Sequence, residues 1–247
     1  MSAMPSKEEF EFLRSIDTPT VCNLVEIVTP ARRGAGYTVK HLHCPFPELP
    51  PVVAFARTVT IKAKDAFGMG DAGYIQRRLD YLDYVAAEPR PTVMVIEDLD
   101  EEPGYGAFWG EVQSNVHQAL GCLGTVTNGC IRDIPMIPPG FQMLAGSIAP
   151  SHAYVHMVDY GGEVNVHGMT VRSNDLIHAD RHGAVVVPAD KIGEMKTALV
   201  GLAEREAKII KAARARHDGR ETQGRDQRLK ADHPALALAS ERGVIGF

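Results

Sequence analysis

The stretch 109–133 constrains the fold of this chain most strongly, because a helix pattern is followed directly by a buried-strand pattern. Apolar residues at helical spacing predict a helix that Gly121 ends; they are Val112, Val116, Ala119 and Leu120. The apolar run at 123–127 predicts a strand, and Asn128-Gly129 predicts a turn after it. Upstream, the apolar run at 92–96 has the composition of a buried parallel strand. Together these segments predict a β-α-β unit in an α/β protein.

Charged residues flank this unit on the side where α/β proteins bind ligands. In a right-handed crossover, the loop before the helix and the loop after the second strand both lie at the carboxyl edge of the sheet. We therefore expect Glu111, at the start of the helix, and Arg132-Asp133, just past the strand, to face one crevice. The first helical turn also offers the unpaired N–H groups of Val112 and Gln113. Such a set suits a hard divalent cation together with a small carboxylate ligand.

These charged residues also have a plainer interpretation. Arg-Asp neighbours are common on protein surfaces, and the first turn of any helix favours glutamate. A nucleophilic hydrolase is not indicated, since the chain has no G-x-S-x-G motif. Neither a Walker motif nor a dinucleotide fingerprint is found, which disfavours a nucleotide enzyme.

Two blocks of the chain resemble a known family. Glu111, twenty intervening residues and then Arg132-Asp133 within NGCIRD resemble the acid-X20-Arg-Asp pattern of the RraA-like family. The block at 161–188, GGEVNVHGMTVRSNDLIHADRHGAVVVP, is similar to the later glycine-rich strands of that family, and 17–21 gives a weaker match. The family includes 4-hydroxy-4-methyl-2-oxoglutarate aldolases, oxaloacetate decarboxylases and proteins that bind and inhibit ribonuclease E.

The resemblance implies an α/β fold of the swivelling β/β/α type, with layered sheets flanked by helices. We expect residues 1–190 to form an RraA-like catalytic domain. Residues 191–247 are expected to form a C-terminal helix and arm that packs between subunits, since an amphipathic helix pattern runs through 188–216. Because the family forms trimers and hexamers, we expect a homotrimer or hexamer.

The resemblance also implies a metal-dependent (class II) aldolase or decarboxylase that acts on a 2-oxo acid through a pyruvate enolate. Asp133 would bind Mg²⁺ or Mn²⁺ directly, and Glu111 would hold one of its waters. Arg132 would pair with the substrate carboxylate and the developing enolate, assisted by the amides of Val112 and Gln113. Retro-aldol cleavage of 4-hydroxy-4-methyl-2-oxoglutarate and decarboxylation of oxaloacetate both pass through this enolate. The absence of lysine from 65 to 190 disfavours a Schiff-base aldolase.

The chain departs from the family pattern at two positions. Met136 stands where the family often has an acid, and Asn128 replaces the usual Asp before the glycine. We expect Met136 to remove a polar group from the rim of the crevice and to alter substrate choice or weaken catalysis. The alternative function is a non-catalytic regulator that acts by binding a protein, as the ribonuclease E inhibitors do. Retention of Glu111, Arg132 and Asp133 favours the enzyme.

The overall composition excludes several other classes. A net charge of −5 without a basic run disfavours a direct nucleic-acid ligand. The N-terminal residues lack an apolar signal core, and no apolar segment approaches the roughly 20 residues of a membrane helix. We therefore expect a cytoplasmic protein without a membrane partner. The four cysteines show no C-x-x-C spacing, which favours free thiols over disulfides or zinc ligands.

Several other segments have weaker patterns. A helix that begins at Thr18, with Thr18 as its cap, carries Asn23 and Glu26, which we interpret as ordinary surface groups rather than crevice residues. Residues 29–50 read as a solvated loop, and its His41, His43 and Cys44 have no further ligands at zinc spacing.

Two segments next to the central unit also carry expectations. After the glycine turn at 68–70, a helix is expected to bury Ile75, Leu79, Leu82 and Val85. The acidic segment 97–102 is expected to be a solvated loop at the mouth of the crevice, or a lid hinged on its glycines.

Overall fold

This computed structural model describes residues 4–66 and 72–221, so the predicted turn at 68–70 and most of the predicted arm lie outside the described residues. The chain divides into two compact units, Met1–Gly193 and Glu194–Phe247. The second unit contains most of the long helix α5 (Ile192–Glu221), which confirms the predicted C-terminal helix. The packing of residues 191–247 between subunits stays a prediction.

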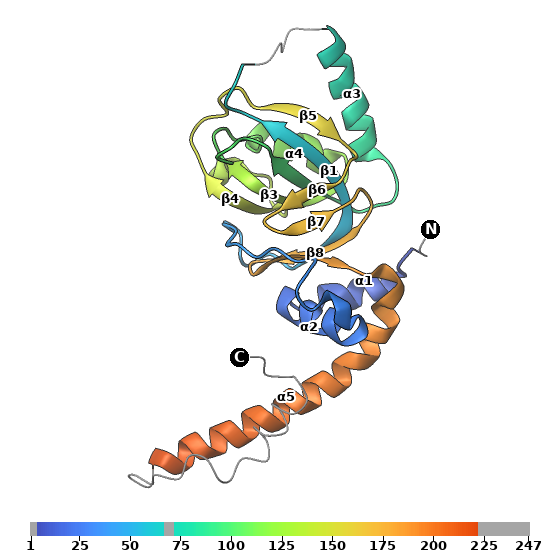
Figure 1. Cartoon of the computed structure of the whole chain (residues 1–247), viewed down its shortest axis with the longest axis vertical. Coiled ribbons are helices and arrows are strands. Elements are labelled where there is room, and N and C mark those ends of the chain that lie inside the picture. The colour runs from blue at the N-terminus through green and yellow to red at the C-terminus, as the bar shows by residue number, and fades with distance from the viewer. Residues whose placement is uncertain (1–3, 67–71, 222–247) are drawn as a thin grey trace. The chain divides into compact units, whose positions relative to one another are not determined.

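A seven-stranded mixed sheet forms the centre of the first unit, with the order β4-β3-β2-β1-β8-β9 and with β5 on the second half of β1 (Figure 1). Strands β1 to β4 run parallel, whereas β5 and β8 run antiparallel to β1. The strands are β1 (Val52–Lys62), β2 (Thr92–Asp98), β3 (Cys122–Ile131), β4 (Gln142–Ile148), β5 (His156–Tyr160), β8 (Leu176–Asp180) and β9 (Gly183–Val187).

The predicted β-α-β unit is confirmed, but the turn predicted at Asn128-Gly129 is wrong, because both residues lie inside β3. Helix α3 (Ala72–Ala86) connects β1 to β2, and α4 (Glu111–Ala119) connects β2 to β3. Strands β2 and β3 pair in parallel, with Val95 opposite Val126. Because the strand order advances in one direction through these crossovers, right-handed connections place both helices on one face of the sheet.

Successive side chains along each strand point to opposite faces of the sheet, so the sheet separates two hydrophobic cores. On one face, Val93, Val95 and Val126 pack with the hairpin of β6 (Val164–Val166) and β7 (Met169–Val171). On the other face, Met94 and Ile96 pack with side chains of α3 and of the loop before α4; these include Tyr81, Val85 and Trp109. The layers are therefore hairpin, sheet and helices, which confirms the predicted β/β/α architecture. Hairpin strand β7 was not predicted from the sequence.

Segment 29–50 is not simply a solvated loop. It begins with a short 3-10 helix, η1 (Pro30–Arg32), and then pairs with both ends of the sheet. Tyr37 forms a β-bridge with Val185 of β9, and His43 exchanges two backbone hydrogen bonds with Ala145 of β4, at 2.7 and 3.0 Å. The segment thus covers the two edge strands that otherwise expose unpaired backbone groups. Within residues 4–66 and 72–221, no group of three or more His, Cys, Asp or Glu side chains is placed to hold a metal ion.

The N-terminal helices follow their predicted caps with one correction. Helix α1 (Lys7–Arg14) begins with a capping box of Ser6 and Glu9. Helix α2 (Thr18–Val28) is capped by Asp17 and not by Thr18, because the Asp17 carboxylate accepts the Thr20 N–H at 2.9 Å. Thr18 is instead buried at the first helical position, where its backbone N–H donates to Asp180.

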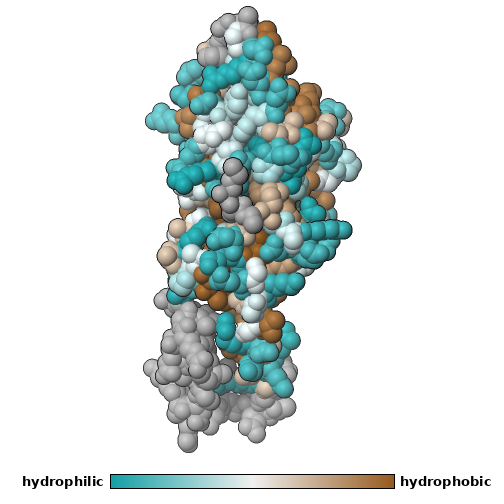
Figure 2. Space-filling view, turned by 90° about the vertical axis from the view of Figure 1, so that its right-hand side faces the viewer, coloured by the Kyte–Doolittle hydropathy of each residue, from teal (hydrophilic) through white to brown (hydrophobic). Residues whose placement is uncertain are grey.

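The predicted apolar faces of α3 and α4 are buried only at their C-terminal ends, where Val85 is in the core and Leu82 and Leu120 pack against it. Ile75 and Leu79 are each 54% exposed, because the first half of α3 extends past the sheet (Figure 1). Figure 2 shows apolar atoms at the corresponding upper end of the molecule. In α4, Val112 is 72% exposed and Val116 is also exposed, whereas the buried side chains are Ser114 and His117. Both helices therefore keep an apolar face outside the core.

The described cysteines are free, as expected. Burial raises the pKa values of Cys122 and Cys130 to about 11, so these thiols stay protonated at neutral pH. Among the helices of the described parts of the chain, none combines the length and the apolar composition needed to cross a bilayer.

Arg57 is a fully buried cation in the middle of β1. Its guanidinium donates to the carbonyl oxygens of Tyr84 at 3.0 Å, Ala87 at 2.5 Å and Pro89 at 3.1 Å, and to the side chain of Asn174. Carbonyls at the end of a helix carry partial negative charge, so they stabilise a cation there. Arg57 therefore fixes the end of α3 against β1.

We expect Arg57→Ala to lower the free energy of unfolding by about 3 kcal/mol, because it leaves buried carbonyls without donors. Urea unfolding followed by circular dichroism measures this change. Arg90→Ala is the matched control, since the exposed Arg90 side chain also donates to an α3 carbonyl, that of Ala86. We expect this control to cost less than about 1 kcal/mol. Equal losses in the two variants would contradict the role of burial.

Candidate active site

The loop before α4 and the end of β3 lie side by side at the carboxyl edge of the sheet. Trp109 forms a parallel β-bridge with Ile131, and Arg132 N–H donates to the Trp109 carbonyl at 3.0 Å. The structure therefore brings the start of α4 next to Arg132-Asp133. The carboxylate oxygen Oδ2 of Asp133 accepts the backbone N–H of Glu111 at 3.3 Å.

Asp133 has a left-handed backbone conformation, with φ 54° and ψ 33°. This conformation is uncommon for residues other than glycine, although Asp and Asn tolerate it better than most. The chain then turns through the 3-10 helix η2 (Ile134–Met136), in which Met136 N–H donates to the Asp133 carbonyl at 2.8 Å. This turn directs the Asp133 carboxylate back toward the first turn of α4.

Gly110 makes this approach sterically feasible. Its backbone is extended, with φ −161°, so the conformation itself does not require glycine. A Cβ atom at this position, however, would lie 2.5 Å from Asp133 Oδ2 and 3.3 Å from Arg132 Nε. Gly110 was not among the residues predicted to form the site; a glycine directly before a predicted helix start is the pattern that could have identified it.

The charges at this edge are nearly balanced. Arg132 Nε lies 3.5 Å from Asp133 Oδ2, and the two side chains are 34% and 35% exposed. Glu111 is exposed in the first turn of α4. Within the described residues, Asp133 Oδ1 and the N–H groups of Val112 and Gln113 make no hydrogen bond. The edge thus offers one carboxylate oxygen to a cation and two N–H groups to an anion.

These groups fit a magnesium-like ion better than a tightly enclosed metal. The described ranges 4–66 and 72–221 hold no cluster of three or more His, Cys, Asp or Glu side chains. Mg²⁺ commonly keeps several waters and binds through one or two carboxylates, with substrate oxygens completing its shell. Asp133, with a free oxygen, and Glu111 in the adjacent helical turn supply such a pair.

The two departures from the family pattern have different positions. Met136 is 55% exposed in the turn that follows Asp133, so it lies beside the site without filling it. Asn128 instead joins two strands: its side-chain oxygen accepts Asp98 N–H at 2.8 Å, and its side-chain nitrogen donates to the Asp98 carbonyl at 3.0 Å. An ionised aspartate could accept the first bond but could not donate the second. Asn128 therefore has a structural role.

The acidic segment after β2 is tied down by two of its own carboxylates. Asp98 accepts the N–H groups of Asp100 and Gly104, at 3.0 and 2.8 Å, and burial raises its pKa. Asp100 accepts the N–H groups of Ala63 and Lys64, at 2.7 and 3.0 Å. These bonds hold the segment in place, which argues against the mobile-lid interpretation.

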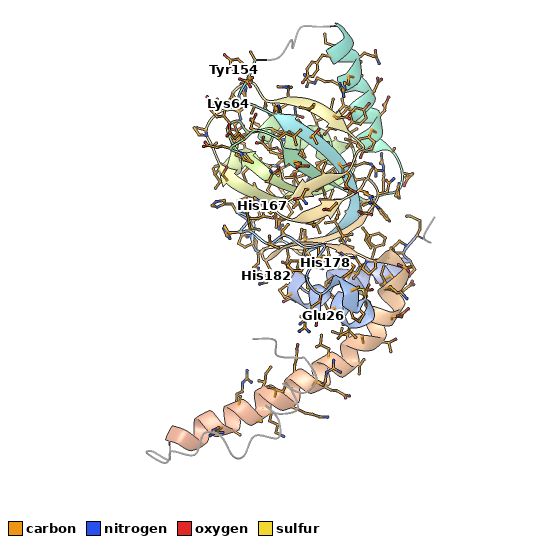
Figure 3. The ribbon with its side chains drawn as sticks, viewed as in Figure 1. Glu26, Lys64, Tyr154, His167, His178 and His182 are labelled. Atoms are coloured by element: carbon orange, nitrogen blue, oxygen red, sulfur yellow. The ribbon has the colours of Figure 1, made fainter. Side chains whose placement is uncertain are left out.

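Helix α2 does not reach this site within one chain. It packs on β8 and β9, at the opposite end of the strand order from β3. Glu26 forms an ion pair with Arg33 at 3.1 Å, and Figure 3 shows Glu26, His178 and His182 in the lower part of the first unit. This placement agrees with the interpretation of Asn23 and Glu26 as ordinary helix residues.

A buried polar pair beneath α4 was missed by the sequence analysis. The His117 Nε2 atom lies 2.6 Å from the Tyr81 hydroxyl, and its Nδ1 atom lies 2.7 Å from the Gln113 carbonyl. The carbonyl requires a donor, so Nδ1 carries the proton and Nε2 accepts from Tyr81. Burial lowers the pKa of His117 from 6.5 to about 4, which keeps the ring neutral. The pair fixes α4 against α3.

Gly110→Ala is expected to displace the Asp133 carboxylate and to lower the free energy of unfolding by about 2 kcal/mol, through steric overlap and loss of the contact at the start of α4. Urea unfolding measures the change. Gly162→Ala is the matched control, because a Cβ there would meet no atom within 4 Å. A similar small effect of both substitutions would contradict the close approach at Gly110.

The low pKa of His117 predicts acid sensitivity. His117 takes up a proton near pH 6.5 in the unfolded chain and only near pH 4 in the folded chain. The contribution of His117 to the free energy of unfolding is therefore fully present above pH 6.5 and decreases as the pH falls toward 4. The loss is on the order of 3 kcal/mol. His117→Gln retains an acceptor for Tyr81 and should flatten this dependence in urea unfolding from pH 4 to 7. An unchanged slope in the variant would contradict the assignment.

Comparisons with known proteins agree with this architecture. Residues 18–186 match the RraA-like family, described as Aldolase/RraA. The structure is similar to that of RraAS2 from Streptomyces coelicolor, which is described as an unusual member of the RNase ES inhibitor RraA protein family. The TM-score is 0.65, with 20% sequence identity, and the match covers 84% of this chain and 98% of RraAS2. The structure of an uncharacterized protein from Pseudomonas syringae pv. tomato is also similar, with a TM-score of 0.64 and 20% sequence identity. The match covers 87% of this chain and 92% of that protein.

The chain spans only part of the curated relatives it matches. It is 25% identical over 140 residues to Protein DlpA of Legionella pneumophila. This match covers 53% of this chain and 22% of DlpA. It is 28% identical over 118 residues to the uncharacterized protein MJ0644 of Methanocaldococcus jannaschii. This match covers 47% of this chain and 57% of MJ0644. The match over residues 18–186, together with the β/β/α layers, shows that the chain belongs to the RraA-like (Aldolase/RraA) family.

Proposed function

We propose that the protein is a divalent-metal-dependent lyase that acts on a 2-oxo acid through a pyruvate enolate. Two reactions suit this site: retro-aldol cleavage of substrates such as 4-hydroxy-4-methyl-2-oxoglutarate, and decarboxylation of oxaloacetate. The observation that carries the proposal is the meeting of Asp133, Arg132 and the first turn of α4 at one point. Membership in a family that includes aldolases and decarboxylases supports it.

The residues at this edge can bind both ends of a small keto acid. The N–H groups of Val112 and Gln113, at the positive end of α4, suit a carboxylate. The Arg132 guanidinium can pair with the same carboxylate and with negative charge that develops on the keto oxygen. The Asp133 carboxylate is held by Glu111 N–H and faces the same region. The reacting group would therefore lie between a cationic and an anionic side chain.

A bound Mg²⁺ or Mn²⁺ would supply Lewis-acid polarisation of the keto group. Asp133 would hold it through the free Oδ1 atom, and Glu111 would hold one of its waters. Glu111, Asp133 and Arg132 together carry one net negative charge, so a divalent ion leaves one positive charge for an anionic substrate. Ion and substrate are thus expected to increase each other's affinity.

The regulator alternative has weaker support. Similarity to RraAS2 at 20% identity concerns the fold and carries no binding partner over to this chain. The predicted homotrimer or hexamer remains part of the proposal and is tested by light scattering. A small 2-oxo acid remains the proposed ligand, with neither nucleic acid nor membrane as a partner.

Asp133→Asn tests the proposal with little change to the fold. Asparagine tolerates the left-handed backbone and keeps an oxygen that can accept Glu111 N–H, but it removes the charge. We expect pyruvate release from oxaloacetate with Mg²⁺ or Mn²⁺ to fall by about 100-fold or more, while the unfolding midpoint changes little. The matched control is Asp83→Asn, at an exposed position of α3, which should keep full activity.

Two further measurements make this test decisive. Titration calorimetry should show that Asp133→Asn weakens Mn²⁺ binding, and EDTA should abolish pyruvate release by the unaltered protein. Full metal-dependent turnover in the Asp133→Asn variant would overturn the proposal. Absence of pyruvate release from both 2-oxo acids by folded protein would also overturn it.

A further inference from the structure

A groove of about 230 Å³ lies between α3 and α4, beside the candidate active site. Its walls are mainly apolar and come from both helices, from the loop before α4 and from β5; they include Tyr74, Leu82, Phe108, Val112, Val116 and Met157. The exposed valines of α4, which the core does not use, form one of these walls. The groove thus explains why α4 presents an apolar face that is not buried.

The groove begins at the residues that offer N–H groups to an anion. Val112 and Gln113 line it with their side chains, while their backbone N–H groups lie in the first turn of α4. Since an α-helix rises only about 1.5 Å per residue, these N–H groups and the Glu111–Asp133 contact lie within one helical turn. A 2-oxo acid whose carboxylate binds this turn can therefore extend its far end into the groove.

The polar groups along the groove indicate what that far end is. The Tyr81 hydroxyl is directed inward to His117 at 2.6 Å, so Tyr81 contributes its ring rather than its hydroxyl to the lining. Arg78 also lines the groove and makes no ion pair or hydrogen bond within the described residues. Aromatic side chains with a single cation suit an aryl group, which can stack on rings and accept a cation on its face.

The size of the groove agrees with this assignment. A cavity of roughly 150 Å³ is enough to hold a benzene molecule. A groove of about 230 Å³ therefore accommodates a phenyl ring and the carbon that joins it to the reacting atoms. A short dicarboxylic far end would bring a second carboxylate among mainly apolar walls, where Arg78 is the one permanently charged lining residue beside the polar side chains of Gln113 and His156.

We propose that this groove binds the leaving half of the substrate and that this half carries an aryl group. The substrate class is then a 4-aryl-4-hydroxy-2-oxo acid. In its cleavage the C3–C4 bond breaks, and the C4 hydroxyl loses its proton as C4 becomes the carbonyl carbon of an aryl aldehyde. The bonding electron pair passes into the pyruvate enolate, which takes up a proton at C3 to give pyruvate. This inference rests on the lyase function proposed above.

The test compares two substrates in the full-length protein with Mg²⁺. Oxaloacetate places no group in the groove, whereas 4-hydroxy-2-oxo-4-phenylbutanoate places its ring there. Val116→Trp fills the groove, and the matched control Ala119→Trp adds the same side chain at an exposed α4 position outside it. Pyruvate release gives kcat/KM for each substrate. We expect Val116→Trp to lower the ratio of phenyl to oxaloacetate kcat/KM by about tenfold or more, and Ala119→Trp to leave the ratio unchanged.

A second variant protects the test against misfolding of Val116→Trp. Arg78 is exposed, so Arg78→Gln should fold, and we expect it to raise the KM for the phenyl substrate by about threefold through loss of the cation. If Val116→Trp and Arg78→Gln both turn over oxaloacetate and both keep the phenyl-to-oxaloacetate ratio of kcat/KM, the groove assignment is overturned. The lyase proposal would stay intact in that case. No metal-dependent pyruvate from either substrate would overturn the lyase proposal itself. A lower oligomer mass of Val116→Trp in light scattering, with unchanged ratios, would identify the groove as a contact between copies and overturn the inference.

Discussion

The pairing of β1 is the constraint on which the rest of the fold depends. This eleven-residue strand pairs with β2 on one side and, on the other, first with β8 and then with β5. Such pairing demands a strand that is buried almost throughout, and Arg57 is tolerated in it only because helix-end carbonyls surround its guanidinium. The parallel register that β1 sets passes through β2 to β3 and so fixes where the candidate site forms.

At that site, the backbone holds charged side chains together that would otherwise repel one another or move apart. Gly110 lets two chain segments approach closely, and the turn after Asp133 directs its carboxylate to the start of α4. A helix N–H group and a guanidinium then offset part of the negative charge before any ligand arrives. The beginning of α4 therefore serves two purposes, since its backbone faces the charged site while Val112 and Val116 face the groove.

The sequence predicted the β-α-β unit and its charged edge because strand periodicity, crossover handedness and flanking residues are local properties. It failed on the faces of α3 and α4, because apolar spacing cannot distinguish a core face from the wall of a groove. His117 and Arg57 occupy core positions because partners distant in sequence satisfy their polar atoms, whereas the buried Ser114 hydroxyl donates to the carbonyl of Gly110 at the start of its own helix. The pairing of segment 29–50 with β4 and β9 depends on contacts more than 100 residues apart and leaves no local pattern.

The left-handed backbone at Asp133 also limits how this position can change over evolutionary time. Glycine, asparagine and aspartate are the residues that accept such a conformation most readily, and of the three only aspartate carries a charge. Drift at this position thus leads most easily to a neutral residue in an otherwise intact scaffold. A single codon change at Asp133 would thus remove a charge from the candidate site and leave the local backbone conformation accessible.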